Sequence, residues 1–345
     1  MNREAHNPIP VILTIDVEPD EFLVDRNNPG PWSGFEFCQG YLETLRQEFR
    51  QATGRPVHLN WMLRMDPQIA TAYGTATWAV DRYGDFFAAC LSQGDAIGLH
   101  VHNYRWSDSL NNWIDDSANS EWMTCCLETA VDAFRDAFGS PATVLRFGSY
   151  WQSTDSVNVA ERLGIRYDLS IEPGVLSTAG VGGRPHTAPT PSFTRVPRVP
   201  YVPSPEDFRR PGSDPASRQI TLIPLTSAYL KLGYRPRELR TRLGRLLRNG
   251  IQGRRQSTPL AMLARWEGEN RFDAMLQRAV DQQQNPYLAF VIRSNINRTR
   301  LARIDPSMRS LLNFCSRKTL VFCTPAEAME QLRQNNSRTT PLAVQ

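Results

Sequence analysis

The chain has 345 residues and a formal net charge of +4, and arginine carries almost all of its positive charge. This length suits one barrel-sized domain, so we expect a single domain over residues 1–345, and the small net charge does not favour a nucleic acid polymer as partner. The sequence has no apolar run of 18 residues and no secretory signal at its N-terminus, which favours a soluble cytoplasmic protein. Six cysteines without CxxC spacing indicate reduced thiols rather than a disulfide framework.

The periodicity of apolar residues predicts strands that alternate with helices. We expect strands over 11–18, 57–64, 96–102, 142–147, 165–171, 288–294 and the start of 319–334. We expect helices over 41–53, from Pro67 to near Gly94, over 121–139 and 153–164, and at the end of 319–334. Because such alternation implies a mostly parallel sheet covered by helices, the sequence predicts an α/β fold that closes into a barrel.

Residues 174–255 interrupt this alternation as a loop and helical insertion. The stretch 174–217 is rich in Pro, Gly and Ser, and we expect a long loop across the barrel mouth, a common place for substrate contacts. The stretch 235–250 has leucines at helical spacing among arginines, which predicts a basic amphipathic helix. This helix either packs as an ordinary surface helix or contacts an anionic membrane or a lipid-linked substrate.

The alternation of side chains along the strands gathers ionisable groups on one face. Asp16 and Glu18 lie opposite the apolar residues of the first strand, and His100 and His102 lie together opposite those of AIGLHVHNY. Two imidazoles at i and i+2 can reach one metal ion and leave room for a carboxylate and a water, although a hydrogen-bonded histidine pair is the alternative.

Further ionisable residues end four of the other predicted strands. Arg64, Arg146, Asp168 and Arg293 each follow or interrupt an apolar set at the carboxyl end of a strand. Charges inside a barrel are costly unless they are paired or ligated, so this gathering is what an active site at that end would supply. For each residue taken singly, an ion pair that closes the barrel is the alternative.

Four segments in this order, TIDVEPD, IGLHVHNY, LRFGSY and YDLS, resemble the polysaccharide deacetylase family, the carbohydrate esterases of chitooligosaccharide-deacetylase type. The resemblance covers roughly Pro10 to Glu172 and is that of a divergent member. It implies a distorted (β/α)₇ barrel and a divalent metal, usually zinc, held by an acid and two histidines. It also implies hydrolysis of an acetyl group on a sugar.

The resemblance implies a role for each matching residue. The pattern of acid, spacer and acid would make Asp16 the catalytic base and Glu18 a metal ligand, or the reverse. The family's second histidine stands four residues after the first, where this chain has Tyr104, so His102 has to be the second ligand beside His100. Arg146 matches the arginine that orients the base, and Asp168 matches an acid that supports that network.

Arg293 stands where the family usually has a histidine that protonates the leaving amine. Arginine cannot donate a proton near neutral pH, but its guanidinium can hold an oxyanion, a carboxylate or a phosphate. We therefore expect an electrostatic role for Arg293, with an ion pair to Asp168 as the alternative.

The candidate substrate contacts are Arg64, Tyr104, Trp106 and Trp151, since aromatic rings can stack on sugar faces. The expected partner is an acetylated sugar, a nucleotide sugar or a lipid-linked glycan. Two other functions stay open at this point. One is a metal-independent amide hydrolase of allantoinase-like type on the same fold, and the other is a catalytically silent homologue that binds carbohydrate or lipid.

Overall fold

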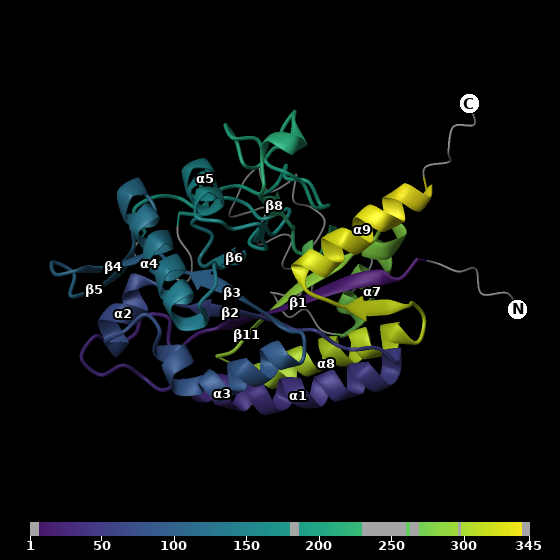
Figure 1. The fold of residues 1–345 in the computed structure, drawn as a ribbon, viewed down its shortest axis with the longest axis horizontal. Helices are drawn as coiled ribbons and strands as arrows, with labels where there is room; N and C mark the ends of the chain where they lie inside the picture. The colour runs from purple at the N-terminus through teal and green to yellow at the C-terminus, as the bar shows by residue number, and fades with distance from the viewer. Residues whose placement is uncertain (1–6, 180–185, 230–259, 263–268, 296–297, 340–345) are drawn as a thin grey trace, which may run out of the picture.

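Strands and helices alternate along most of the chain (Figure 1) in a computed structural model that describes residues 7–179, 186–229, 260–262, 269–295 and 298–339. The strands are β1 (Ile9–Val17), β2 (Asn60–Arg64), β3 (Ala96–Val101), β4 (Tyr104–Ser107), β5 (Asn112–Asp115), β6 (Val144–Phe147), β7 (Tyr167–Asp168), β8 (Thr221–Leu222), β9 (Ser227–Tyr229), β10 (Leu260–Met262), β11 (Leu288–Arg293) and β12 (Leu320–Phe322). The helices are α1 (Ser33–Thr53), α2 (Pro67–Tyr73), α3 (Trp78–Ser92), α4 (Ser120–Phe138), α5 (Thr154–Arg162), α7 (Glu269–Asp281), α8 (Arg298–Cys315) and α9 (Pro325–Thr339), with a 3₁₀ turn at Pro215–Ser217.

The main sheet is parallel and curled, with the strand order β11-β1-β2-β3-β6-β7-β8, and β12 pairs with the start of β1. The segment after β8 forms hydrogen bonds with β11. The amide of Thr226 donates to the carbonyl oxygen of Ala289 at 2.8 Å, and the amide of Ala289 donates to Thr226 Oγ1 at 2.8 Å. The two edges of the sheet are thereby joined, and the expected distorted (β/α)₇ barrel is confirmed.

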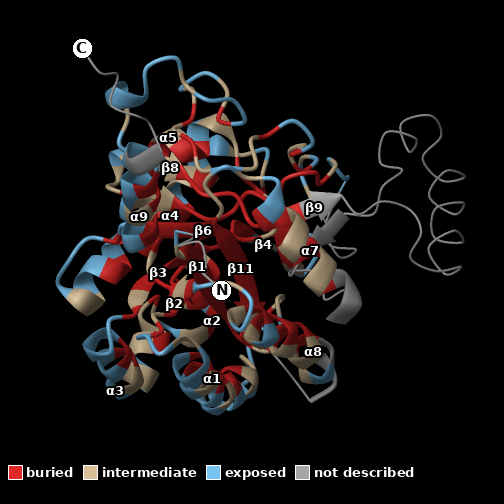
Figure 2. Ribbon diagram, turned by 90° about the vertical axis from the view of Figure 1, so that its right-hand side faces the viewer, coloured by how far each residue is buried: buried red, intermediate tan, exposed pale blue. Residues whose placement is uncertain are grey.

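Apolar side chains form two layers, one on each side of the curled sheet. The larger layer lies between the strands and the surrounding helices, as the buried residues in Figure 2 show. The smaller layer fills the inside of the sheet and is completed by α9, which contributes Ala328 and Leu332. Its strand residues include Ile12, Met62 and Val144. Because side chains alternate along a strand, the inward positions farther toward the carboxyl ends belong to Thr14 and Asp16 on β1, to Arg64 on β2 and to Arg146 on β6.

Several elements differ from the sequence-based expectation. The helix expected from Pro67 to Gly94 is divided, because Gly74 adopts a left-handed φ of 87° and ends α2. Helix α1 begins at Ser33, eight residues before the expected start, and the hairpin of β4 and β5 was not predicted. The predicted basic helix over 235–250 lies outside the described residues. None of the described helices has the length and apolar character of a transmembrane span.

Candidate active site

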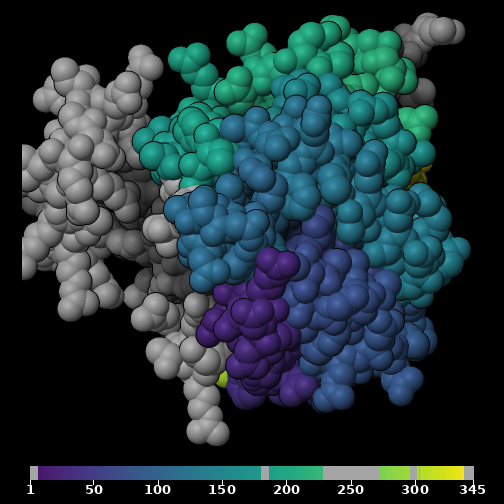
Figure 3. Space-filling view, turned by 90° about the vertical axis from the view of Figure 1, so that its left-hand side faces the viewer, coloured from purple at the N-terminus to yellow at the C-terminus, as the bar shows by residue number. Residues whose placement is uncertain are grey.

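Polar residues occupy the inner face of the sheet at the carboxyl ends of its strands. Arg64, His100 and Arg146 are register partners across β2, β3 and β6, and Glu18 directly follows β1. All four side chains are buried. Figure 3 looks onto this end of the molecule, where the loop after β1 meets the β4–β5 hairpin and Trp113 Nε1 donates to the carbonyl oxygen of Val24 at 2.7 Å.

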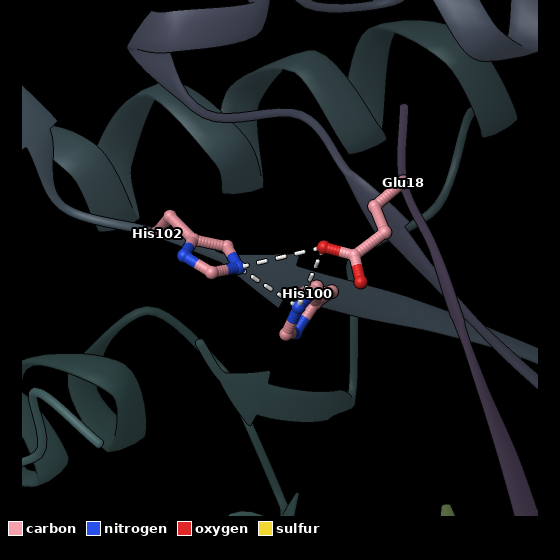
Figure 4. Close-up of side chains that lie close together, drawn as sticks. All are labelled: Glu18, His100 and His102. Atoms are coloured by element: carbon pink, nitrogen blue, oxygen red, sulfur yellow. Dashed lines mark hydrogen bonds and ion pairs between the residues drawn. The ribbon is translucent and has the colours of Figure 1, made fainter. Parts of the chain in front are cut away.

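Glu18, His100 and His102 point toward one another (Figure 4). The two Nε2 atoms of the histidines are 3.0 Å apart, and Glu18 Oε2 lies 4.0 Å from that of His100 and 3.9 Å from that of His102. The structure therefore brings together the three metal ligands that the sequence predicts.

The bonding around these groups fits a divalent cation. His100 Nδ1 is 3.0 Å from the carbonyl oxygen of Arg146. This oxygen can only accept a hydrogen bond, so the proton of the neutral imidazole is on Nδ1 and the Nε2 lone pair faces the cluster. Burial, with Arg146 and Arg64 nearby, lowers the pKa of His100 to about 3, so the imidazole is neutral at neutral pH. Glu18 Oε2 is buried and accepts no hydrogen bond from a described residue. Ligands about 2.0 Å from a tetrahedral zinc ion lie about 3.3 Å apart, close to the spacing of the two histidines.

The second carboxylate, Asp16, is held by Arg146. Arg146 Nε lies 2.9 Å from Asp16 Oδ1 and 3.1 Å from Asp16 Oδ2, and Arg146 Nη1 donates to the carbonyl oxygen of Leu169 at 2.9 Å. Asp16 Oδ2 is 3.8 Å from His100 Nε2. Asp16 thus lies beside the cluster of Glu18, His100 and His102, within ion-pair distance of His100 and held from the other side by Arg146.

Arg293 pairs with Glu18, and not with Asp168 as the alternative had it. Its Nε and Nη2 lie 2.8 Å and 2.6 Å from Glu18 Oε1, and its guanidinium lies 3.9 Å from the centre of the Phe22 ring. One oxygen of Glu18 is therefore occupied by Arg293, while the other faces the histidines.

Asp168 lies on the opposite face of its strand from the one predicted. Its register partner is Leu145, which belongs to the outer apolar layer, so Asp168 points away from the barrel interior, contrary to the expectation. Its carboxylate accepts hydrogen bonds from Ser170 and from Gln152 Nε2. Burial raises the pKa of Asp168 to about 6. The predicted face of Asp168 is wrong because β7 has only two residues, too few for an alternating pattern to determine a face.

The acid beside Arg146 is Glu172, which sequence reasoning missed. Glu172 Oε1 lies 3.7 Å from Arg146 Nη2, and Tyr150 OH donates to Glu172 Oε2 at 2.6 Å. Glu172 lies in the loop after β7, where no strand period marks it. Glu172 is the next acid after Asp168 in the sequence, but it lies two residues beyond the resembling fourth segment.

The four predicted substrate contacts differ in exposure. Arg64 is fully buried, and its Nε and Nη2 donate to Asp66, while Nη2 also donates to Gln68. Arg64 therefore forms a buried ion pair, which was the alternative to a substrate contact. Tyr104 is also fully buried, with its ring stacked on His102. Neither residue offers surface to a substrate. Trp106 is half-buried on the β4–β5 hairpin, and Trp151 is buried along a cavity beside the site.

A solved structure of another protein shares the fold of this chain. No family model and no curated protein matches the chain. A solved structure of a candidate glycoside hydrolase/deacetylase from Parabacteroides distasonis aligns with 96% of this chain and 73% of its own, at 14% identity and a TM-score of 0.51. The chain shares this deacetylase fold.

Two other solved structures align over nearly their whole length. A candidate polysaccharide deacetylase from Mycobacterium smegmatis aligns with 100% of this chain and 96% of its own, at 8% identity and a TM-score of 0.47. A peptidoglycan deacetylase from Bacillus subtilis aligns with 96% and 95%, at 11% identity and a TM-score of 0.38.

Proposed function

We propose that the chain is a metal-dependent hydrolase that removes an acetyl group from an acetylated amino sugar or glycan precursor. The observation that supports this proposal is that two neighbouring buried carboxylates have different partners. Glu18 faces the Nε2 atoms of His100 and His102, and Asp16, two residues earlier on β1, is held by Arg146. An acidic ligand beside two histidines, next to a separately oriented carboxylate, suits metal-assisted hydrolysis.

Glu18, His100 and His102 would hold the cation, which supplies Lewis-acid polarisation of the acetyl carbonyl and acidifies water when bound. Asp16 is the base in this proposal, because Arg146 fixes the direction of its carboxylate beside the proposed metal ligands. It takes a proton from the attacking water and returns it to the amine when the carbon–nitrogen bond breaks. Glu18 suits the base role less well, since Arg293 occupies its second oxygen.

The substrate is an acetylated sugar, in free form or attached to a nucleotide or lipid carrier. The fold shared with deacetylases and the buried carboxylates support a sugar acetyl group as the reacting part. The carrier stays a prediction, since the basic segment expected to meet a lipid, 235–250, lies outside the described residues.

The test combines metal content with acetate release. Purified wild type is expected to hold one divalent ion by elemental analysis, and His100→Ala is expected to lose it. His58→Ala is the matched control, because His58 contacts Glu327 away from the site and should retain the ion. Acetate release from acetylated amino sugars should fall about 10²- to 10⁴-fold in Asp16→Asn, the range expected for loss of a general base.

Asp85→Asn, an exposed position on α3, is the control for the activity measurement. Equal metal content in wild type and His100→Ala would contradict the metal site. Acetate release by a metal-free protein would favour the metal-independent amide hydrolase. Sugar binding without acetate release would favour a silent binding homologue.

A further inference from the structure

Two consecutive residues in the loop between β6 and α5 have a left-handed backbone. Ser149 has a φ of 51° and Tyr150 has a φ of 60°, a region that non-glycine residues rarely adopt. Glycine would take this conformation without steric cost, so the serine and the tyrosine are held here under strain. Strain of this kind persists only where the surrounding structure holds it, and it collects at functional sites. The contacts of the two side chains indicate what this turn does.

Ser149 contacts the proposed metal ligand His102. Its Oγ lies 3.2 Å from His102 Nδ1 and 2.9 Å from the hydroxyl oxygen of Tyr104. The Tyr104 ring stacks on the imidazole, with the ring centres 4.9 Å apart and 20° between the planes. A hydroxyl that is bonded to Nδ1 resists rotation of the imidazole, so Nε2 stays directed toward Glu18 and His100.

Tyr150 contacts the group of side chains around the proposed base, Asp16. Its hydroxyl donates to Glu172 Oε2 at 2.6 Å, and Glu172 Oε1 lies 3.7 Å from Arg146 Nη2. The same guanidinium holds Asp16, with Nε 2.9 Å from Asp16 Oδ1. Glu172 and Asp16 are each 2% exposed, so bulk water has little access to these contacts. Tyr150 is therefore linked to Asp16 through two intervening side chains.

We propose that Ser149 and Tyr150 are positioning residues that orient the proposed metal ligands and the proposed base from one strained turn. Ser149 keeps the imidazole of His102 turned toward the other ligands, and Tyr150 keeps Glu172 beside Arg146. The left-handed conformation lets two successive side chains reach these two different partners. The effects on metal binding and on acetate release rest on the proposed function, whereas the orientation of the side chains does not.

The orientation is measured by ¹⁵N NMR of the full chain in the presence of a chelator, which needs neither a bound ion nor a substrate. The ring nitrogens of His102 and the Nε of Arg146 are expected to give single signals in wild type. Ser149→Gly should broaden or split the His102 signals and leave the Arg146 signal unchanged, because the imidazole loses the hydroxyl at Nδ1. Tyr150→Phe should broaden or split the Arg146 signal and leave those of His102 unchanged.

Each variant has a matched control elsewhere in the chain. Asn111→Gly places glycine at another left-handed position, with a φ of 44°, at an exposed residue of the β4–β5 hairpin. Tyr83→Phe removes a hydroxyl that donates to Glu36 at 3.0 Å on the surface. Both controls should give the wild-type signals. Ser149→Gly adds no backbone strain and Tyr150→Phe keeps the aromatic ring, so both should fold.

The two variants should also differ in function. Ser149→Gly should weaken Zn²⁺ binding by about 10- to 100-fold in chelator competition, the range for loss of a hydrogen-bond partner of a metal-binding histidine. Tyr150→Phe should bind Zn²⁺ as wild type does. It should lower kcat for acetate release by about tenfold with little change in KM, a part of the roughly 10²- to 10⁴-fold that a general base contributes.

Unchanged His102 signals in folded Ser149→Gly, or an unchanged Arg146 signal in folded Tyr150→Phe, would overturn the proposal. Equal Zn²⁺ affinities in Ser149→Gly and Asn111→Gly would also overturn it. A raised KM with unchanged kcat in Tyr150→Phe would make Tyr150 a substrate contact instead. If wild type binds no ion and releases no acetate, the proposed function fails, and the NMR signals still decide whether this turn orients the two side chains.

Discussion

At the scale of single residues, Gly148 determines how closely β6 can approach His102. A Cβ atom at this position would overlap Nε2, Cδ2 and Cε1 of the His102 ring. Gly148→Ala should therefore displace the imidazole and weaken divalent metal binding by about 10- to 100-fold, as for other changes that misorient a ligand. Competition with a chromogenic chelator measures this affinity.

The control for this change is Gly40→Ala on α1, where an added Cβ meets nothing within 4 Å. It should bind metal as the wild type does. Equal affinities in Gly148→Ala and wild type would show that the His102 ring does not need its present position for metal binding.

Asp168 gives a pH dependence of stability whose sign follows from its pKa. Burial raises this pKa from 3.8 to about 6, so the folded state holds the proton more tightly than the unfolded state does. The favourable contribution is complete below pH 3.8 and is lost as the pH rises through about 6. In Asp168→Asn this loss is absent, so the variant should gain up to roughly 3 kcal/mol relative to wild type between acidic and neutral pH.

Urea unfolding of wild type and Asp168→Asn from acidic to neutral pH measures this difference, and Asp85→Asn should follow the wild type. Gln152 can turn its amide to accept from the new side chain, because its Oε1 has no donor among the described residues. A constant difference between Asp168→Asn and wild type across this range would contradict the raised pKa.

The alternation of side chains along the strands predicted which site residues face the barrel interior. It could not place the site residues that lie outside regular strands. Asp16, Glu18, His100 and His102 lie as expected, because β1 and β3 are long enough for alternation to fix a face. Glu172 and Asp66 could not be predicted, since both lie in segments without a strand period. Ser149 and Tyr150, with φ of 51° and 60°, take a left-handed conformation that non-glycine residues rarely adopt and that the sequence does not indicate.

At the scale of elements, the early start of α1 has a cause distant in the sequence. The amide of Gly34 donates to Asp20 Oδ1 at 2.7 Å, and Ser33 Oγ donates to Asp20 Oδ2 at 2.7 Å. Asp20 thus caps the first turn from the loop after β1. The usual capping signal stands directly before a helix, so the pattern around residue 41 predicted too short a helix.

The pairing of β11 with β1 makes Arg293 a positioning residue for Glu18. Arg293→Ala should leave Glu18 without its ion-pair partner and weaken metal binding by about 10- to 100-fold. Arg293→Lys keeps the charge but loses the two-pronged contact and the stacking on Phe22, so its metal affinity should lie between those of wild type and Arg293→Ala. Chelator competition measures all three.

Arg309→Ala is the matched control, because Arg309 pairs with Glu48 at 2.6 Å on the surface. If Arg293→Ala binds metal as tightly as Arg309→Ala but loses acetate release, Arg293 acts on the substrate rather than through Glu18. That result would return Arg293 to the role that the sequence suggested for it.

At the scale of the whole molecule, Thr226 joins the two edges of the sheet. Thr226→Val keeps the shape but removes the acceptor for the buried amide of Ala289. The free energy of unfolding should fall by about 1 to 3 kcal/mol, the cost of a buried donor without a partner. Chemical denaturation measures it, and Thr44→Val on the exposed side of α1 is the control, for which a smaller change is expected. An equal loss of unfolding free energy in Thr226→Val and Thr44→Val would mean that the hydrogen bond between Thr226 and Ala289 stabilises the protein no more than an exposed one.

The donor set of two imidazoles and one carboxylate has a consequence for sample preparation. Nitrogen and oxygen donors of this kind accept several first-row divalent ions, whose affinities rise from manganese to copper and fall again at zinc. No thiolate is among the three donors to favour a softer ion. The ion recovered with the protein should therefore record the metals supplied during expression, and cultures grown with iron or with zinc should yield protein that differs in metal content and not in sequence.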